Sequence, residues 1–154
     1  MLRAVPLSLL LLAAGPAAAA PEPLGRFATW GAFRAGGLCY AMSEPARRQR
    51  VPGPYVTITT EPKWRRFREL HVRLPRPAKT AQVLIGDATF PLLVQGLDAW
   101  PVRPTDGARI AARLRKDATM RVEHHTIGGR YRTDYYPAAG AASAIDAADI
   151  ACLR

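Results

Sequence analysis

Serine, histidine and cysteine are scarce in this sequence, and their scarcity removes the residues on which many enzyme sites depend. Beyond residue 20 the serines are Ser43 and Ser143, and neither lies in the Gly-x-Ser-x-Gly turn that presents a hydrolase nucleophile. The chain also has no glycine-rich phosphate loop and no paired-carboxylate motif. We therefore predict no catalytic residue and no cofactor.

The histidines do not have the spacing of a metal site. His124 and His125 are adjacent in a segment that alternates like a β-strand, so their side chains point to opposite faces. His124 shares the apolar face with Val122, and His125 lies on the polar face. His71 and Asp134 are the remaining candidate ligands. We predict structural histidines and no metal.

Long apolar runs are missing except at the N-terminus. There Arg3 precedes an apolar stretch at residues 5–14, and small residues follow at 17–20. This order is typical of a secretory signal peptide, which we place at residues 1–20. The stretch is much shorter than the roughly 20 apolar residues that span a bilayer. The sequence thus predicts a periplasmic or secreted protein with no transmembrane segment.

The rest of the chain, residues 21–154, has the length of a single domain. It contains two cysteines, Cys39 and Cys152, separated by 113 positions. An even number of cysteines in an exported chain favours a disulfide over metal ligands. In the chain-entropy model, closing a loop this long stabilises a protein by about 4–5 kcal/mol. We predict the disulfide Cys39–Cys152.

Acidic residues are also few: 12 Asp and Glu face 22 Lys and Arg, for a net charge of +10, or +9 once Arg3 is removed. The excess is concentrated in residues 44–79, which hold ten basic and three acidic residues. A basic surface of this kind attracts polyanions or anionic membranes. The alternative is that the charge reflects a composition rich in Ala, Arg and Pro, without selection for binding.

Within this basic region, residues 63–68 interleave aromatic and cationic side chains. The candidates for binding an anion or a membrane surface are Lys63, Trp64, Arg65, Arg66 and Arg68. Such a segment suits a membrane interface or an acidic glycan. The alternative is an exposed sheet edge protected by charge. The other strand aromatics are expected to pack in the core or on strand faces: Trp30, Tyr40, Tyr55, Phe90 and Trp100.

Period-two alternation predicts strands at residues 56–60 and 69–74. Two hairpins are predicted at 83–90 and 120–136, each with glycine in its turn. Helices are predicted from Thr105 or Asp106, as the N-terminal cap, to 116 and over 141–151. Pro91 indicates an edge or bulged strand. The fold class is therefore mainly β: a β-sandwich or open-barrel-like antiparallel domain with two short helices and one disulfide.

Several short motifs follow one another along residues 27–152. They are Trp30-Gly31-Ala32-Phe33, Cys39-Tyr40-Ala41-Met42-Ser43-Glu44-Pro45, Tyr55, Val83-Leu84-Ile85-Gly86, Phe90-Pro91-Leu92, Asp98-Ala99-Trp100, Asp134-Tyr135, Gly140, Ala144 and Cys152. In this order they resemble the invasion-associated locus B family of exported bacterial proteins. The resemblance implies an exported, β-rich domain, a contribution to host-cell invasion in some members, and no known catalytic activity. Residues 62–77 are richer in arginine than the family pattern.

The residues and the resemblance together predict an exported, non-catalytic envelope or host-interaction protein that acts through binding. The expected partners are anionic lipid, an acidic glycan, or an envelope or host protein, and not nucleic acid. The alternative is a periplasmic hydrolase or metal-dependent enzyme with an unrecognised site. Convergence of His71, His124, His125 and Asp134 would favour that alternative.

Overall fold

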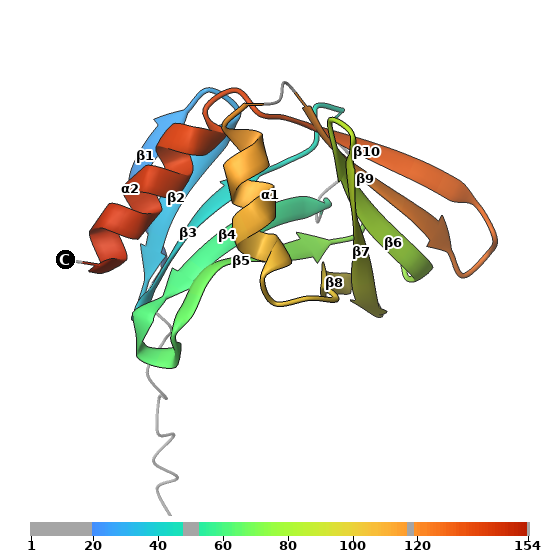
Figure 1. Ribbon diagram of the computed structural model, residues 1–154, viewed down its shortest axis with the longest axis horizontal. Helices are drawn as coiled ribbons and strands as arrows, with labels where there is room; N and C mark the ends of the chain where they lie inside the picture. The colour runs from blue at the N-terminus through green and yellow to red at the C-terminus, as the bar shows by residue number, and fades with distance from the viewer. Residues whose placement is uncertain (1–19, 48–52, 117–118, 154) are drawn as a thin grey trace, which may run out of the picture.

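The computed structural model describes residues 20–47, 53–116 and 119–153. Within them the chain forms ten β-strands, two α-helices and one short 3-10 helix (Figure 1). The strands are β1 (Glu22–Phe27), β2 (Trp30–Ala35), β3 (Leu38–Ser43), β4 (Tyr55–Glu61), β5 (Arg66–Arg73), β6 (Ala78–Ile85), β7 (Ala88–Gln95), β8 (Asp98–Pro101), β9 (Thr119–Thr126) and β10 (Tyr131–Pro137). The helices are η1 (Pro62–Trp64), α1 (Asp106–Leu114) and α2 (Ala141–Leu153). The expected signal peptide, residues 1–20, lies outside the described residues except for Ala20.

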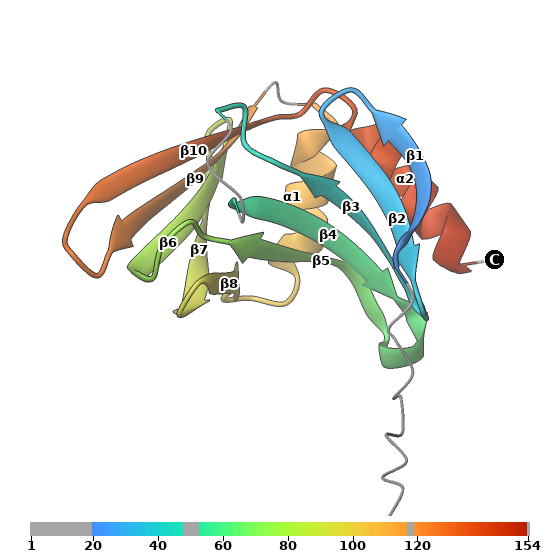
Figure 2. The same cartoon turned by 180° about the vertical axis from the view of Figure 1, so that it is seen from behind.

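All ten strands belong to one antiparallel sheet, in the order β1-β2-β3-β4-β5-β8-β7-β6-β9-β10. Most strands pair with their neighbours in sequence. The exceptions are β5 and β6, which do not pair with each other, and β8 and β9; instead, β5 pairs with β8 and β6 pairs with β9. Because β1 and β10 end the order, the sheet is open rather than closed. It curves, and both helices lie on one of its faces (Figures 1 and 2). The predicted open, antiparallel, mainly β fold with two short helices is confirmed.

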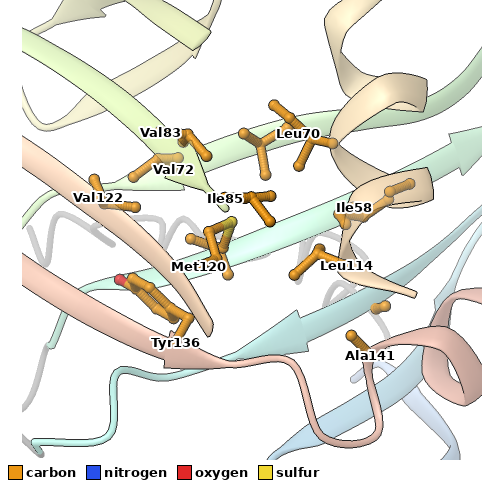
Figure 3. Close-up of a cluster of buried hydrophobic side chains, with 14 of the residues drawn as sticks. Ile58, Leu70, Val72, Val83, Ile85, Leu114, Met120, Val122, Tyr136 and Ala141 are labelled. Atoms are coloured by element: carbon orange, nitrogen blue, oxygen red, sulfur yellow. The ribbon is translucent and has the colours of Figure 1, made fainter. Parts of the chain in front are cut away.

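The core lies on the helix-covered face of the sheet, where side chains from both halves of the curve meet (Figure 3). Leu70 and Val72 of β5 are fully buried there, as strand alternation predicts. They pack with Val83 of β6 and Val122 of β9 in the same cluster. Each such side chain contributes about 1.5–3 kcal/mol when it leaves water. The two halves of the sheet are therefore held together by apolar packing.

The two predicted hairpins are confirmed. β6 and β7 are joined through Gly86, with φ of 58°, and β9 and β10 through Gly129, with φ of 78°. Glycine adopts this left-handed backbone without the strain that a Cβ would cause. Pro91 lies in an interior strand, contrary to the edge or bulge expected there. It is tolerated because β8 ends at Pro101, which pairs with Leu92. Pro91 therefore has no β8 residue opposite it to which a backbone N–H would have to donate.

α1 begins after Thr105, without a capping hydrogen bond from that residue's side chain. Thr105 therefore occupies the N-cap position, as predicted, but its side chain does not cap the helix. Asp106 is fully buried in the first turn and serves another role. Its carboxylate accepts hydrogen bonds from Arg103 at 3.0 Å and Arg109 at 2.8 Å. Burial opposes ionisation, but these two bonds hold the pKa of Asp106 below its usual value. The predicted apolar face packs into the core: Ile110, Ala111 and Leu114.

α2 packs on β1 to β4, and the predicted disulfide ties its end to the sheet. Cys39 of β3 is bonded to Cys152 of α2, with their Cα atoms 5.8 Å apart. At the other end of α2, Gly140 has φ of 90°, and a Cβ there would lie 1.8 Å from the carbonyl oxygen of Phe27. Glycine is therefore required where the chain turns from β10 into α2.

Candidate functional site

The connection between β4 and β5 carries the residues predicted to bind an anionic partner. Its turn, η1, begins at Pro62 and is closed by Arg65, whose backbone N–H donates to the carbonyl of Pro62 at 3.0 Å. Arg65 has φ of 55°, which reverses the chain within a few residues. The turn leaves Trp64 61% exposed and Phe67 52% exposed. We refer to residues 63–67 as the hairpin tip, which lies at the lower edge of the molecule in Figure 1.

The cations of the hairpin tip differ in how far they are neutralised. Arg66 lies 3.8 Å from the carboxylates of both Glu61 and Glu69. Lys63 places its Nζ 5.2 Å from the ring centroid of Trp64. Among the described residues, neither Lys63 nor Arg65 forms an ion pair with a carboxylate. Two uncompensated positive charges therefore flank an exposed indole ring.

Arg68 has a different environment from the other candidate residues. Its Nε donates to Asp149 of α2 at 2.8 Å, and Thr60 of β4 donates to the other carboxylate oxygen at 2.6 Å. Asp149 is buried, and Arg68 is half-buried. The structure gives Arg68 a role in attaching α2 to the sheet, so the surface site consists of Lys63, Trp64, Arg65 and Arg66. The sequence alone could not distinguish Arg68 from the surface cations, because its partner Asp149 is 81 positions away.

Two exposed apolar side chains that no sequence pattern had indicated lie at the same end of the molecule as the hairpin tip. Ile150 is 50% exposed and Leu153 is 59% exposed, and both follow Asp149 in α2. The Arg68–Asp149 ion pair holds this end of α2 against β5. Figures 1 and 2 show the C-terminus and the β4–β5 connection at one end of the molecule. This end therefore combines uncompensated cations with exposed apolar side chains.

The face of the sheet opposite the helices carries a second group of polar and aromatic contacts. Asp98 accepts hydrogen bonds from His71 at 2.9 Å and Arg73 at 2.6 Å. Burial opposes ionisation of Asp98, but the bonds from Arg73 and His71 hold its pKa below the usual value. The His71 ring lies 5.2 Å from the ring of Trp100 and 6.0 Å from that of Tyr55. His71 is thus bound within a structural network.

The strand aromatics pack as predicted, in two places. Trp30 and Phe90 are 1% exposed and belong to the core. Tyr40, Tyr55 and Trp100 are half-buried. Tyr40 stacks on the ring of Phe33 at 5.4 Å, and the other two contact the ring of His71.

The alternation predicted for the adjacent histidines is confirmed. His124 is buried, at 1% exposure, whereas His125 is exposed and lies 5.1 Å from the ring of Tyr131. His124 and Asp134 line one cavity, from which His71 and His125 are absent. In the part of the chain that the structure describes, no group of three or more His, Cys, Asp or Glu residues could hold a metal ion.

No family model, curated protein or solved structure matches this chain. No helix of the described residues has the length and apolar character needed to cross a bilayer.

Proposed function

We propose that this chain is an exported, non-catalytic envelope protein that attaches to an anionic membrane surface through the hairpin tip. The observation that supports this most is the exposure of Trp64, which is 61% accessible and lies between Lys63 and Arg65. The described residues supply no carboxylate partner for either of these two cations. Tryptophan suits the boundary between water and lipid, because its ring is apolar and its N–H is polar. Lysine and arginine beside it would contact lipid phosphates.

The expected attachment is weak and reversible. A basic residue near an anionic surface contributes about 1 kcal/mol, so Lys63, Arg65 and the partly neutralised Arg66 supply about 2–3 kcal/mol. Trp64 and Phe67 add apolar contact, and Ile150 and Leu153 lie at the same end of the molecule. Attachment through several weak contacts of this kind should respond strongly to salt, because exposed charges are screened over about 8–10 Å.

The resemblance to the invasion-associated locus B family supports the exported, envelope-associated part of this proposal. The disulfide Cys39–Cys152 is in keeping with an oxidising compartment. A role at the host surface would follow if the anionic membrane were that of a host cell.

The test is co-sedimentation of the oxidised protein, without residues 1–20, with lipid vesicles. Binding should be strong to vesicles that contain phosphatidylglycerol, weak to pure phosphatidylcholine, and progressively lost as salt is added. The double variant Lys63→Glu/Arg65→Glu should abolish it. Trp64→Ala should weaken it with little change in salt dependence, because the indole ring supplies apolar area and no charge. All variants should keep the parent melting temperature, since exposed charges contribute little to stability.

Lys79→Glu/Lys116→Glu is the matched control, because it makes the same change in net charge at exposed residues outside the hairpin tip. It should leave most of the vesicle binding intact. If both double variants lose binding equally, the attraction is diffuse and the hairpin tip is not a site. Binding to soluble polygalacturonate but not to vesicles would replace the membrane with an acidic glycan as the partner.

A further inference from the structure

A polar cavity lies at the ends of β4 and β5 that are opposite the hairpin tip. Its volume is about 880 Å³, and the lining residues that matter here are Arg47, Arg76, His124, Thr126, Arg132 and Asp134. They come from the segments after β3 and β5 and from the inner faces of β9 and β10. The size is within the roughly 300–1,000 Å³ of small-molecule sites.

His124 is the most buried of the polar residues that line this cavity. It is 1% exposed, and neither its Nδ1 nor its Nε2 has a hydrogen-bond partner among the described residues. Burial, and next the charges of Arg132 and His125, lower the pKa of His124, so its ring is neutral at pH 7. A neutral imidazole offers one donor and one acceptor. Leaving such groups buried and unsatisfied is unfavourable, and a polar ligand would offset this cost.

The mouth of the cavity is strongly cationic. Arg47, Arg76 and Arg132 are exposed there, and the described residues give none of the three an ion pair. Arg76 and Arg132 also line an adjoining hollow of about 400 Å³, together with Arg130. Other arginines of the described residues do pair with carboxylates: Arg34, Arg66, Arg68, Arg73, Arg103, Arg109, Arg113 and Arg115. Guanidinium groups bind carboxylates and phosphates through paired N–H donors.

The inner part of the cavity selects against a bare anion. His124 is unsatisfied there among the described residues, and a ligand with only acceptor oxygens would bond its N–H but leave its acceptor nitrogen without a partner. A ligand that suits the whole cavity therefore carries an acidic group for the arginines and hydroxyl groups, which both donate and accept, for His124. Sugars that bear a carboxylate or a phosphate have this combination.

We propose that this cavity binds an acidic monosaccharide unit, with its acidic group on Arg76 and Arg132 and its ring hydroxyls at His124. The site is separate from the hairpin tip and stands whether or not the tip binds membranes. The acidic group could be the carboxylate of a uronic acid or the ester of a sugar phosphate, and the two are distinguished by the test below.

The test is NMR of the protein without residues 1–20, labelled with ¹⁵N at histidine. The chain has three histidines, so their ring signals can be resolved individually. Glucuronate and glucose 6-phosphate are titrated separately, with glucose and inorganic phosphate as partial ligands. The expected result is saturable shifts of both ring nitrogens of His124 with at least one acidic sugar, and no shift at His71 or His125. Each partial ligand should bind at least about tenfold more weakly, since each lacks about 1.4 kcal/mol or more of the contacts.

Arg132→Gln and Arg76→Gln should each weaken the acidic sugar about tenfold or more, as expected when a charge-assisted hydrogen bond is removed. Arg65→Gln, an exposed arginine of the hairpin tip, is the matched control and should change nothing. Conversely, Arg132→Gln should keep the vesicle binding of the parent. The proposal is overturned if neither acidic sugar moves His124, if inorganic phosphate binds as well as glucose 6-phosphate, or if Arg65→Gln weakens the sugar as much as Arg132→Gln.

Discussion

At the residue scale, Gly107 determines how closely α1 approaches the sheet. A Cβ at this position would lie 2.3 Å from the carbonyl oxygen of Arg68 and 3.2 Å from the Cα of Glu69. Glycine to alanine inside a helix normally stabilises by up to about 1 kcal/mol. Here the added methyl group would meet backbone atoms, so the helix must move away from β5.

We therefore expect Gly107→Ala to lower the free energy of unfolding by about 1–3 kcal/mol, the usual cost of overpacking. Gly37→Ala is the control, because a Cβ at Gly37 meets nothing within 4 Å. Urea denaturation measures both. A stabilised Gly107→Ala would mean that α1 does not lie this close to β5.

His124 makes a second prediction at this scale, which concerns pH. Its pKa is lowered from 6.5 by burial, and next by Arg132 and His125. The unfolded state therefore binds a proton at a higher pH than the folded state, and stability falls as pH decreases below about 6.5. The lowered pKa values of Asp98 and Asp106 act further down, because their contribution is lost only as pH falls below 3.8 toward the folded values.

Urea denaturation between about pH 7 and pH 5 should show stability rising with pH, as linkage requires. His124→Gln should flatten this dependence whatever its effect on absolute stability. His125→Gln is the neighbouring comparison and should keep most of the slope, because burial, the largest cause of the lowered pKa of His124, remains in place. An unchanged slope in His124→Gln would show that the buried ring is not the source.

At the scale of the elements, α2 is held by several contacts and not by the disulfide alone. Asp149 bonds to Thr60 and Arg68, and the guanidinium of Arg34 donates to the carbonyl of Ala151 at 2.9 Å. The disulfide closes a loop of 113 positions, so its main effect falls on the unfolded chain. The native position of α2 should survive its removal.

Cys152→Ser should therefore lower the free energy of unfolding by about 4–5 kcal/mol and leave the near-ultraviolet circular dichroism of the folded state little changed. Calorimetry and spectroscopy on parent and variant measure the two effects. The parent should also show no free thiol under denaturing, non-reducing conditions. Two titratable thiols in the purified parent, or an unchanged melting temperature in the variant, would contradict this.

At the scale of the whole molecule, local patterns predicted the elements but not their assembly. Alternation in β4 and β5 and the turn glycines Gly86 and Gly129 identified strands and hairpins, because these depend on neighbouring residues. The order of ten strands depends on pairings such as β5 with β8, which no local pattern encodes. The candidate site follows the same rule: the exposed Trp64 could be predicted, whereas the pairing of Arg68 with Asp149 could not.

The hairpin tip and the acidic-sugar cavity lie at opposite ends of β4 and β5, so attachment through the tip would direct the cavity away from the membrane. The three tryptophans report this orientation. Trp30 is in the core and Trp100 is half-buried on the outer face, whereas Trp64 is 61% exposed at the tip. Only Trp64 should therefore come within reach of lipid chains.

We expect phosphatidylglycerol-containing vesicles with brominated acyl chains to quench part of the tryptophan fluorescence of the parent. Trp64→Phe keeps an aromatic ring at the tip and should remain bound, but its fluorescence should no longer be quenched. Trp100→Phe should keep the quenching, because the quenched indole is still present. Both variants are checked for vesicle binding by co-sedimentation, so that an absence of quenching is not mistaken for an absence of attachment. Quenching that persists in Trp64→Phe and disappears in Trp100→Phe would mean that the molecule approaches the membrane with the outer face of its sheet, and the hairpin tip would then be only the charged end of two strands.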